Sequence, residues 1–372
     1  MEENYCTSKL ATPAFEQTTR INRTMRWTFS ILLLIALTAF SANNNSTFPV
    51  DEPLYDPVFR EKMRQVMLER KSTRFELGRT RLGQTVEAWY FPGTSNKNAL
   101  VIGGVHGSEL SSIEVVHELV ERLSNGDSIY YNTIIIPCLF PDNASIAKKQ
   151  LHEIGSTKNI GRYSFPGAAD PNRQMPAPGH PPDEEQEQDH AGRKVERENM
   201  LLLQLIQELK PARIASVHAI RNKDFAGFFA DPRADANGIA LGYETDSTLA
   251  VNMAFHVFNK GGYVPGNKLD VKPTTVYYKD PSPAPKGEWQ QRNFTGSPAQ
   301  GYKGSGVSLG TWASTAVKDS LYPSNDRDAI SIITIEFPGS RRSEDYPTSL
   351  QKKSCRKQVT AYAAAIHEVF LR

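Results

Sequence analysis

The sequence predicts an α/β fold with a largely parallel β-sheet, and its apolar runs carry this prediction. Residues 99–105 and 132–140 form continuous apolar runs, as expected for strands buried on both faces of a sheet. Further strands are expected at 212–220 and 330–337. Helices with one apolar stripe are expected between or after them, at 109–123, 196–209 and 350–371. Strands that alternate with helices are typical of α/β domains with a parallel sheet.

The segments around these elements complete the expected topology. Residues 43–55 have the polar composition of a linker, and 56–71 carry apolar residues at helical spacing. Residues 74–93 are expected to form a hairpin, whose antiparallel strands at one edge would make the sheet mixed. A helix is expected at 247–260, inside a segment (221–305) that also holds the Pro- and Gly-rich stretch YYKDPSPAPKGEW.

Composition bounds the class of protein. A chain of 372 residues is long enough for one large or two ordinary domains. The 39% hydrophobic and 23% charged content fits a soluble globular protein. The net charge of +2, without a Lys/Arg cluster interleaved with aromatics, gives no reason to expect a nucleic-acid partner.

The N-terminus carries an export-type segment. Arg20, Arg23 and Arg26 precede an apolar run at 27–40, and small residues follow it. The run is shorter than the roughly 20 residues that span a bilayer, which favours a cleaved signal peptide over a signal anchor within 1–42. Met25 is an alternative start. Either alternative predicts an exported protein, periplasmic or secreted, which contacts the membrane only if the segment is uncleaved.

The three cysteines do not have metal-binding spacing. Cys6 precedes the apolar run and would be lost with it. Cys138 and Cys355 could form a disulfide in an oxidising compartment, or both could be buried free thiols. The sequence leaves both alternatives open.

Polar side chains follow several of the predicted strands where each one ends. His106 follows the strand at 99–105, Asp142 follows 132–140, and His218 and Glu336 lie at the ends of two later strands. Ligands of open α/β sheets bind beyond the carboxyl ends of the strands. These residues are therefore expected along one edge of the sheet.

This set of side chains predicts a catalytic zinc site. Such a site needs three protein ligands and leaves a position for water, and His106, Glu109 and His218 supply two imidazoles and a carboxylate. Glu336 is the candidate base that would deprotonate the attacking water. An H-x-x-E pair alone recurs by chance, so the prediction depends on His218 and Glu336 lying at strand ends.

The stretch ADPNRQMP supplies a second group of candidates. Arg173 presents a planar fork that can grip a carboxylate, and Asn172 adds a neutral donor. Asp170 could orient a zinc-binding histidine through its second ring nitrogen. Taken alone, the stretch could equally be a surface turn with a solvated arginine.

In order along the chain, these motifs resemble those of the zinc carboxypeptidase family. The motifs are HGSE (106–109), FPDN (140–143), DPNR (170–173), SVH (216–218) and TIEF (334–337). The stretches GVHGSE and GSGVSLGTWAS are similar to a bacterial branch that acts on murein peptides. The resemblance covers roughly 74–370 and implies a mixed eight-stranded sheet flanked by helices. It implies zinc on His106, Glu109 and His218, Glu336 as base and acid, and a carboxylate clamp of Asn172 and Arg173.

The resemblance also implies two roles that the residues themselves do not indicate. An arginine should stabilise the oxyanion, and Arg162 is the match, with Lys158 as the alternative. A tyrosine should cap the substrate, but Trp312 stands near that place, with Tyr302 and Tyr322 as other candidates. The chain departs from the family pattern at Phe140, Asn143 and Gln174.

These observations predict an exported zinc metallohydrolase, a carboxypeptidase or amidase. Its catalytic domain would span 74–372 after a linker and helix at 43–73, with an insertion at about 221–305. The expected substrate is a peptide or muropeptide with a free carboxylate next to the scissile amide. A zinc-dependent deacylase of N-acyl amino acids and an inactive carboxylate-binding relative are the alternatives.

Overall fold

The computed structural model describes residues 57–165, 167–182, 188–189, 192–269 and 306–372. They belong to one compact unit that spans Pro53–Arg372. The predicted signal segment (1–42) and linker (43–55) lie outside the described residues, so both stay predictions. Among the described residues, no helix has the length and apolar character to cross a bilayer.

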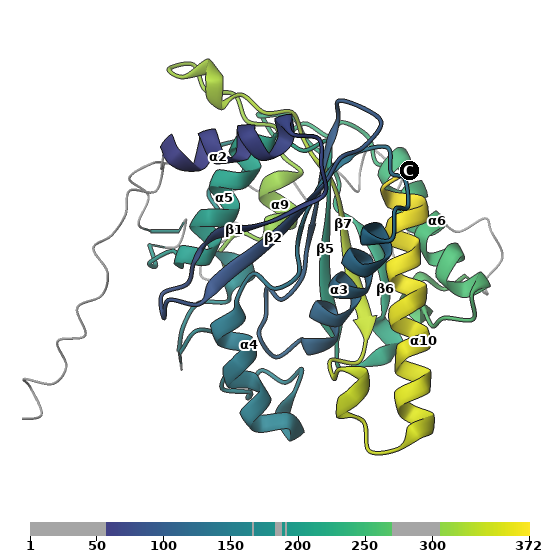
Figure 1. The fold of residues 1–372 in the computed structure, drawn as a ribbon. Helices are drawn as coiled ribbons and strands as arrows, with labels where there is room; N and C mark the ends of the chain where they lie inside the picture. The colour runs from purple at the N-terminus through teal and green to yellow at the C-terminus, as the bar shows by residue number, and fades with distance from the viewer. Residues whose placement is uncertain (1–56, 166, 183–187, 190–191, 270–305) are drawn as a thin grey trace, which may run out of the picture. The chain divides into compact units, whose positions relative to one another are not determined.

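A mixed seven-stranded sheet forms the centre of this unit (Figure 1). Its spatial order is β1-β2-β4-β3-β5-β7-β6. The four inner strands β4, β3, β5 and β7 are parallel, whereas β1, β2 and β6 pair antiparallel at the two edges. The α/β class and the mixed, largely parallel sheet are therefore confirmed. The strands are β1 (Thr73–Arg79), β2 (Thr85–Phe91), β3 (Asn98–Ile102), β4 (Asn132–Ile136), β5 (Arg213–Ile220), β6 (Gly227–Ala230) and β7 (Ser331–Pro338).

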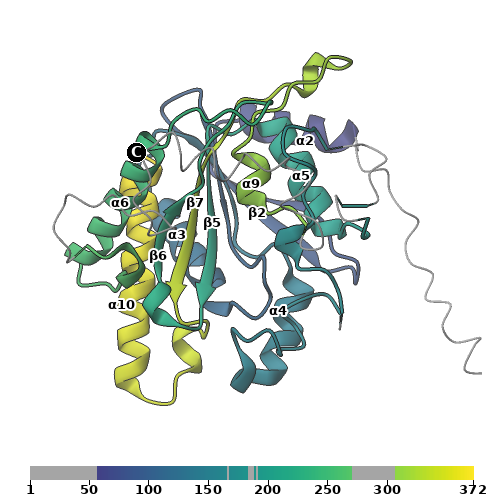
Figure 2. The ribbon, with the colours of Figure 1, turned by 180° about the vertical axis from the view of Figure 1, so that it is seen from behind.

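Helices cover both faces of the sheet (Figures 1 and 2). One face carries α3 (Leu110–Ser124), α6 (Glu244–Asn259) and α10 (Ser349–Ala365). The other carries α2 (Pro57–Leu68), α5 (Arg197–Leu209) and α9 (Leu309–Ala313). The short helix α4 (Pro141–Ala147) follows β4 directly. A π-helical segment, Ile366–Phe370, continues α10. Short 3₁₀ helices complete the description: Lys148–Glu153, Pro171–Arg173, Lys223–Phe225, Pro265–Asn267, Pro323–Asn325 and Ser343–Asp345.

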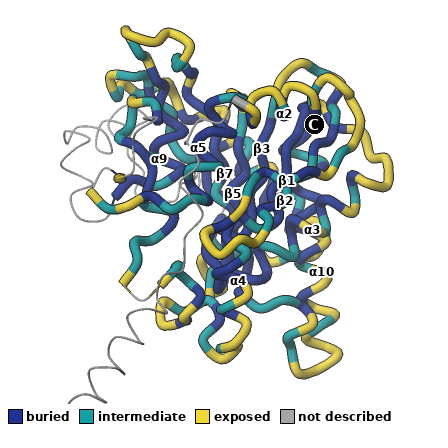
Figure 3. The backbone as a smooth tube through the Cα atoms, turned by 60° about the vertical axis from the view of Figure 1, so that its left-hand side comes forward, coloured by how far each residue is buried: buried dark blue, intermediate teal, exposed yellow. Residues whose placement is uncertain are grey.

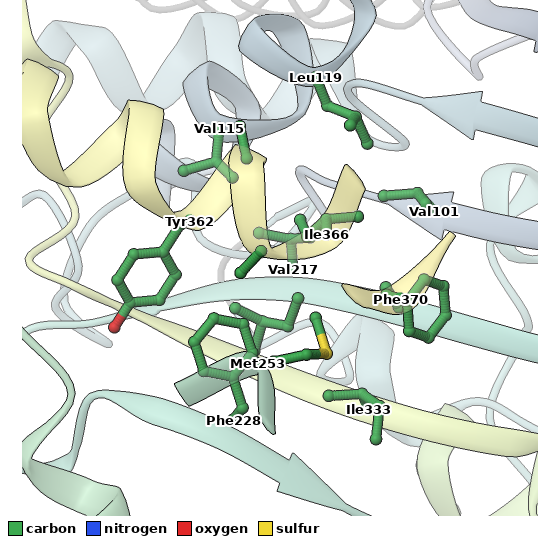
Figure 4. Close-up of a cluster of buried hydrophobic side chains, with 14 of the residues drawn as sticks. Val101, Val115, Leu119, Val217, Phe228, Met253, Ile333, Tyr362, Ile366 and Phe370 are labelled. Atoms are coloured by element: carbon green, nitrogen blue, oxygen red, sulfur yellow. The ribbon is translucent and has the colours of Figure 1, made fainter. Parts of the chain in front are cut away.

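Side chains along the inner strands point alternately to the two faces of the sheet and form a hydrophobic core on each face. Val101, Val217 and Ile333 point to the α10 face, where Figure 4 shows them with side chains of that helix. Leu100 and Ile214 point to the opposite face, toward α5 and α9. Full burial of such a side chain contributes about 1.5–3 kcal/mol. The strands are thus buried on both faces, as the continuous apolar runs predict and as Figure 3 shows.

The expectation of eight strands is corrected, since the described residues form seven. Among the described residues, a side chain and not an eighth strand hydrogen-bonds to the outer edge of β6. The amide of Asn267 accepts a hydrogen bond from the backbone N–H of Phe228 (2.9 Å) and donates one to its carbonyl (2.8 Å). One side chain thereby supplies the donor and the acceptor that a neighbouring strand would have offered at this residue.

The segment predicted as an insertion contributes to the core where it is described. Its residues 221–269 include β6, which pairs with β7, and α6, which packs against the sheet and against α10. Residues 270–305, with Tyr302 and the whole Pro- and Gly-rich stretch, lie outside the described residues. Whether 221–305 narrows access to a site therefore stays a prediction.

Cys138 and Cys355 are free thiols, so the alternative of a disulfide between them is not realised. Burial raises the pKa of each thiol to about 12. Both therefore stay protonated and poorly nucleophilic at neutral pH.

We expect Asn267→Ala to destabilise the protein by about 2–4 kcal/mol, because two backbone groups of Phe228 lose their partner in a buried place. Urea denaturation of the full chain measures the effect. Asn237→Ala is the matched control, since Asn237 is exposed and should change the free energy of unfolding by less than about 0.5 kcal/mol. Equal stabilities of the two variants would contradict this account of the sheet edge.

Glu198 predicts a pH dependence of stability. Burial, reinforced by Glu196 and Asp142 and opposed by Arg81, raises its pKa to about 7. Desolvation thus outweighs the favourable place of a carboxylate in the first turn of α5. This pKa lies above the usual 4.5 of a glutamate. The stabilisation by the neutral carboxyl group is therefore complete below about pH 4.5 and is lost as pH rises through 7.

We expect Glu198→Gln to remove the loss of folding stability that accompanies ionisation of Glu198. At pH 8 the variant should be more stable than the wild type by up to about 3 kcal/mol. Denaturation curves between pH 5 and 8 measure the difference. Glu121→Gln, at an exposed position of α3, is the control and should leave the pH profile unchanged. A wild-type profile that does not fall between pH 5 and 8 relative to Glu198→Gln would show that Glu198 is ionised in the folded protein.

Candidate functional site

A cavity of about 380 Å³ lies beyond the carboxyl ends of the inner strands. Strand β3 leads by way of α3 to β4 on one side, and the chain later returns to place β5 on the other side. The order of the strands therefore reverses at β3, and such a switch point opens a crevice at the ends of the two diverging strands. Eight of the predicted site residues line this one cavity: His106, Glu109, Arg162, Asp170, Asn172, Arg173, His218 and Glu336.

The turn between β3 and α3 delivers His106 and Glu109. Glu109 directly precedes the first residue of α3 and caps the helix, which fixes the position of its backbone. Gly107 lets this turn approach the backbone of Gly161 closely, because a Cβ atom at Gly107 would lie 2.2 Å from the carbonyl oxygen of Gly161. The turn can thus pack directly against the loop that carries Arg162.

His106, Glu109 and His218 converge from two strands onto one point. Their potential ligand atoms all lie within 4.8 Å of one another, and all three residues are buried. The Nδ1 atom of His106 is 2.9 Å from Oε1 of Glu109, and the Nδ1 atom of His218 is 3.2 Å from Oε2. Among the described residues, this is the one group of His, Cys, Asp and Glu side chains with metal-binding geometry.

The second ring nitrogen of each histidine, His106 and His218, lies within hydrogen-bond distance of a further side chain. Asp170 Oδ1 is 2.8 Å from Nε2 of His106, and Ser216 Oγ is 3.0 Å from Nε2 of His218. Metal-binding histidines are commonly oriented by such a partner on the other nitrogen. Two oriented imidazoles and one carboxylate, all buried, form a donor set that fits zinc.

Charges inside the site shift the titration of its members. Burial alone would raise the pKa of Glu109, but His106 and His218 hold it well below its usual value. Burial alone would lower the pKa of His106, but Glu109 and Asp170 raise it to about 9. Burial also opposes ionisation of Asp170, yet hydrogen bonds and the charge of His106 lower its pKa to about 2. The carboxylates that face the histidines therefore stay ionised at neutral pH.

The pairing of β5 with β7 places the candidate base. His218 and Glu336 are direct neighbours in the parallel register of these strands. Side chains on one face of a strand repeat every second residue, so Ser216 and His218 share a face, as do Thr334 and Glu336. All four line the cavity. This face is apolar at Ile214 and Ile332, and it becomes polar only toward the carboxyl ends.

A short turn at Pro171–Arg173 carries the candidate clamp. Asp170 begins this turn and accepts a hydrogen bond from the backbone N–H of Asn172 (2.8 Å), so the same carboxylate holds both the turn and His106. Asn172 in turn accepts a hydrogen bond from the backbone N–H of Leu309 at the start of α9 (3.0 Å). These bonds fix Asn172 and Arg173 at the cavity wall.

Arg162 reaches the cavity from the loop after α4. Its guanidinium donates to Oε1 of Glu109 at 2.9 Å, and its second terminal nitrogen lies 3.5 Å from Nδ1 of His106. Lys158, the alternative, is exposed and does not line the cavity. The structure therefore brings Arg162, and not Lys158, to the predicted centre.

Solved structures that are similar to this chain include those of an amidase, a metallo-carboxypeptidase and a fibrinolysis inhibitor. Murein-tripeptide amidase MpaA from Escherichia coli O157 is 18% identical, with 79% of this chain and 91% of that chain covered and a TM-score of 0.41. A metallo-carboxypeptidase from Burkholderia cenocepacia is 13% identical (85% and 69% covered, TM-score 0.41). Bovine thrombin-activatable fibrinolysis inhibitor is 12% identical (84% and 96% covered, TM-score 0.43).

No family model matches the chain, and no curated protein of similar sequence does. The likeness to the solved structures is distant.

The expected contact of Trp312 with substrate is corrected. Trp312 is fully buried and belongs to the core beneath α9. Its indole N–H donates to the carbonyl of His180 (2.9 Å), and Arg327 lies 4.7 Å from the ring. Tyr322 is exposed and does not line the cavity, while Tyr302 lies outside the described residues. The first turn of α9 instead presents Ser308 and Gly310 to the cavity.

Several lining residues were missed by the sequence reasoning. Ser216 and Thr334 could have been found by extending the strand alternation backward from His218 and Glu336. Asp231 follows the short edge strand β6, in a segment that the sequence did not resolve into elements. Its place beside the cavity depends on the antiparallel pairing of β6 with β7, and no local sequence pattern predicts this pairing.

We expect the full chain, stripped of metal and titrated with zinc, to bind one equivalent. His106→Ala and His218→Ala should weaken binding by more than the roughly 10- to 100-fold typical of losing an outer partner of a metal ligand. Calorimetric titration measures the affinity, and zinc should also raise the Tm of the wild type by mass action. His117→Ala, at an exposed position of α3, is the control. Undiminished zinc affinity in both site variants would contradict this ligand set.

Proposed function

We propose that this protein is a zinc-dependent hydrolase that cleaves an amide bond next to a free carboxylate. One observation carries the proposal: a buried His-Glu-His group, a carboxylate in register with it and an Asn-Arg pair line the same cavity. A metal alone, or an arginine alone, would suit many functions. Their combination in one cavity suits a substrate that brings a carbonyl and a carboxylate together.

The residues divide the chemistry among them. When bound to His106, Glu109 and His218, zinc supplies Lewis-acid polarisation of a carbonyl and a lowered pKa for water. Glu336, on the strand next to His218, accepts the proton of the attacking water. It then passes this proton to the nitrogen of the leaving amine, so that one carboxylate acts first as base and then as acid.

In this proposal, Arg162, Arg173 and Asn172 position the substrate. Arg173 offers two parallel N–H donors to the substrate carboxylate, and Asn172 flanks it at the same wall. Arg162 lies beside the metal ligands, where a guanidinium can stabilise negative charge that develops on the carbonyl oxygen. Oriented donors of this kind act without reorganising during the reaction, which is why they lower the barrier.

A peptidoglycan peptide is our preferred substrate, and export to the periplasm or outside the cell is part of the proposal. The support is the basic and apolar N-terminal segment together with the motifs GVHGSE and GSGVSLGTWAS. A deacylase of N-acyl amino acids would use the same zinc set and clamp. An inactive carboxylate-binding relative would keep the clamp without turnover.

We expect Glu336→Gln to keep zinc and to lower kcat by about 100- to 10,000-fold, because proton transfer loses its carrier. We expect Arg173→Met to raise KM, because the carboxylate loses a bidentate partner. Mass spectrometry of the products from γ-glutamyl-diaminopimelate peptides, a library of peptides varied at the C-terminal residue, and N-acyl amino acids measures both. Glu121→Gln is the control for the loss of a carboxylate.

The outcomes separate the alternatives. Cleavage of the peptides supports the proposal, whereas cleavage of N-acyl amino acids alone supports the deacylase. Binding of zinc and of carboxylates without any turnover supports the inactive relative. Full activity of Glu336→Gln would overturn the role given to this residue.

A further inference from the structure

A buried asparagine on α5 holds the turn that carries the clamp. Asn199 is fully buried, and its Nδ2 atom donates to the carbonyl of Pro171 (2.8 Å) and to Oε1 of Gln174 (2.7 Å). Pro171 directly precedes Asn172 in the chain, and Gln174 directly follows Arg173. One side chain of the helix therefore bridges the two ends of the Asn-Arg pair.

A backbone donor fixes which atom each of the two amides presents. The backbone N–H of Glu196 donates to Oε1 of Gln174 (3.0 Å), so Gln174 must present its oxygen at this point. The same oxygen faces Asn199, which must therefore present its NH₂ group. Both N–H bonds of that group are used, because the carbonyl of Pro171 accepts the second one. These contacts define one arrangement of the turn relative to α5.

Helix α5 gives the contact a rigid base. Asn199 is the third residue of this helix. Further along, four residues of the helix are buried in the hydrophobic core on one face of the sheet: Leu202, Leu203, Leu205 and Ile206. A close-packed core does not follow the movements of a turn, so Asn199 holds a fixed position. The clamp is thereby tied to the core of the domain.

The position of Arg173 depends on the backbone of this turn. Leu309 fixes the side chain of Asn172, whose carbonyl accepts a hydrogen bond from the guanidinium of Arg173 (2.6 Å). The turn is tied to α5 by Asn199, and Arg193 donates to the carbonyl of Arg173 from another segment (2.9 Å). Loss of the tie to α5 would therefore let the guanidinium move from its place in the cavity wall.

We propose that Asn199 is a positioning residue, whose two hydrogen bonds hold Arg173 where it binds the substrate carboxylate. The inference rests on the proposed function, in which Arg173 is the bidentate partner of that carboxylate. Asn199 does not line the cavity, so it acts through the turn and not on the substrate itself. Its acceptor Gln174 is a residue at which the chain departs from the family pattern, so the resemblance implies the clamp but not this tie.

The test measures binding of γ-glutamyl-diaminopimelate whose carboxylate next to the scissile amide is either free or converted to a neutral carboxamide. Zinc-loaded Glu336→Gln is the background, because it should bind the peptide without cleaving it. We expect Asn199→Leu to lower the affinity for the free acid by about 10-fold, because a displaced guanidinium loses its bidentate geometry. The affinity for the carboxamide should stay almost unchanged. Calorimetric titration measures both affinities.

Two controls separate a displaced clamp from a damaged fold. Gln207→Leu is the matched variant, since Gln207 is a buried amide of the same helix that donates to Asn325 (3.3 Å) and not to the clamp. It should leave both peptide affinities unchanged, and zinc affinity should be equal in all variants. If Asn199→Leu does not fold, Gln174→Met removes one of the two acceptors and should show the same selective loss.

Turnover gives a second measure of the same role. With Glu336 in place, Asn199→Leu should raise KM for the free acid about 10-fold and leave kcat almost unchanged. This split is expected because the substrate and the transition state share the carboxylate contact.

A double-mutant cycle shows whether Asn199 acts through Arg173. When Arg173→Met is already present, Asn199→Leu should cause no further loss of affinity for the free acid. An equal loss with and without Arg173 would overturn the inference, as would unchanged affinity in Asn199→Leu, and cleavage by the wild type would then leave the hydrolase standing. Selective loss of acid binding in Asn199→Leu, without cleavage of any substrate by the wild type, would retain the positioning role and overturn the hydrolase.

Discussion

The buried carboxylate of Glu109 is the interaction on which the site depends. Burying an ionised carboxylate costs many kcal/mol unless it is paired and hydrogen-bonded. Four groups provide this compensation: His106, Arg162, His218 and the backbone N–H of Ala219. They come from the β3–α3 turn, from the loop after α4 and from β5. Satisfying one carboxylate therefore fixes three separate parts of the chain against one another.

The sheet extends this local constraint to the neighbouring carboxylate of Glu336. The parallel pairing of β5 and β7 alone is enough to place His218 beside Glu336. The same strands bury Ile214 and Ile332 deeper in the core, so the polar ends stand on a rigid apolar base. In the proposed hydrolase this rigidity matters, because a metal ligand and a proton carrier must hold their separation during the reaction.

Much of this architecture could be predicted from the sequence, because periodicity reports burial directly. The inner strands and their polar ends follow from apolar runs that stop at His106, His218 and Glu336. The expectation for Trp312 was wrong because sequence proximity to a motif does not reveal which face of a five-residue helix packs inward. The described residues form seven strands rather than the eight that the resemblance implies, and the Asn267 side chain pairs with the backbone of β6 at Phe228.

Asp231 shows why other residues of the cavity wall are harder to predict than the candidate metal ligands. Metal ligands are few residue types, and they fall at strand ends where a parallel sheet brings them together. Asp231 instead reaches the cavity through an antiparallel edge strand of four residues and is held by Thr334 and by the absence of a side chain at Gly310. Three elements that are distant in sequence decide its position, and none of them carries chemistry by itself. The candidate metal ligands therefore follow from short motifs, whereas the rest of the cavity wall depends on tertiary packing, which only the structure displays.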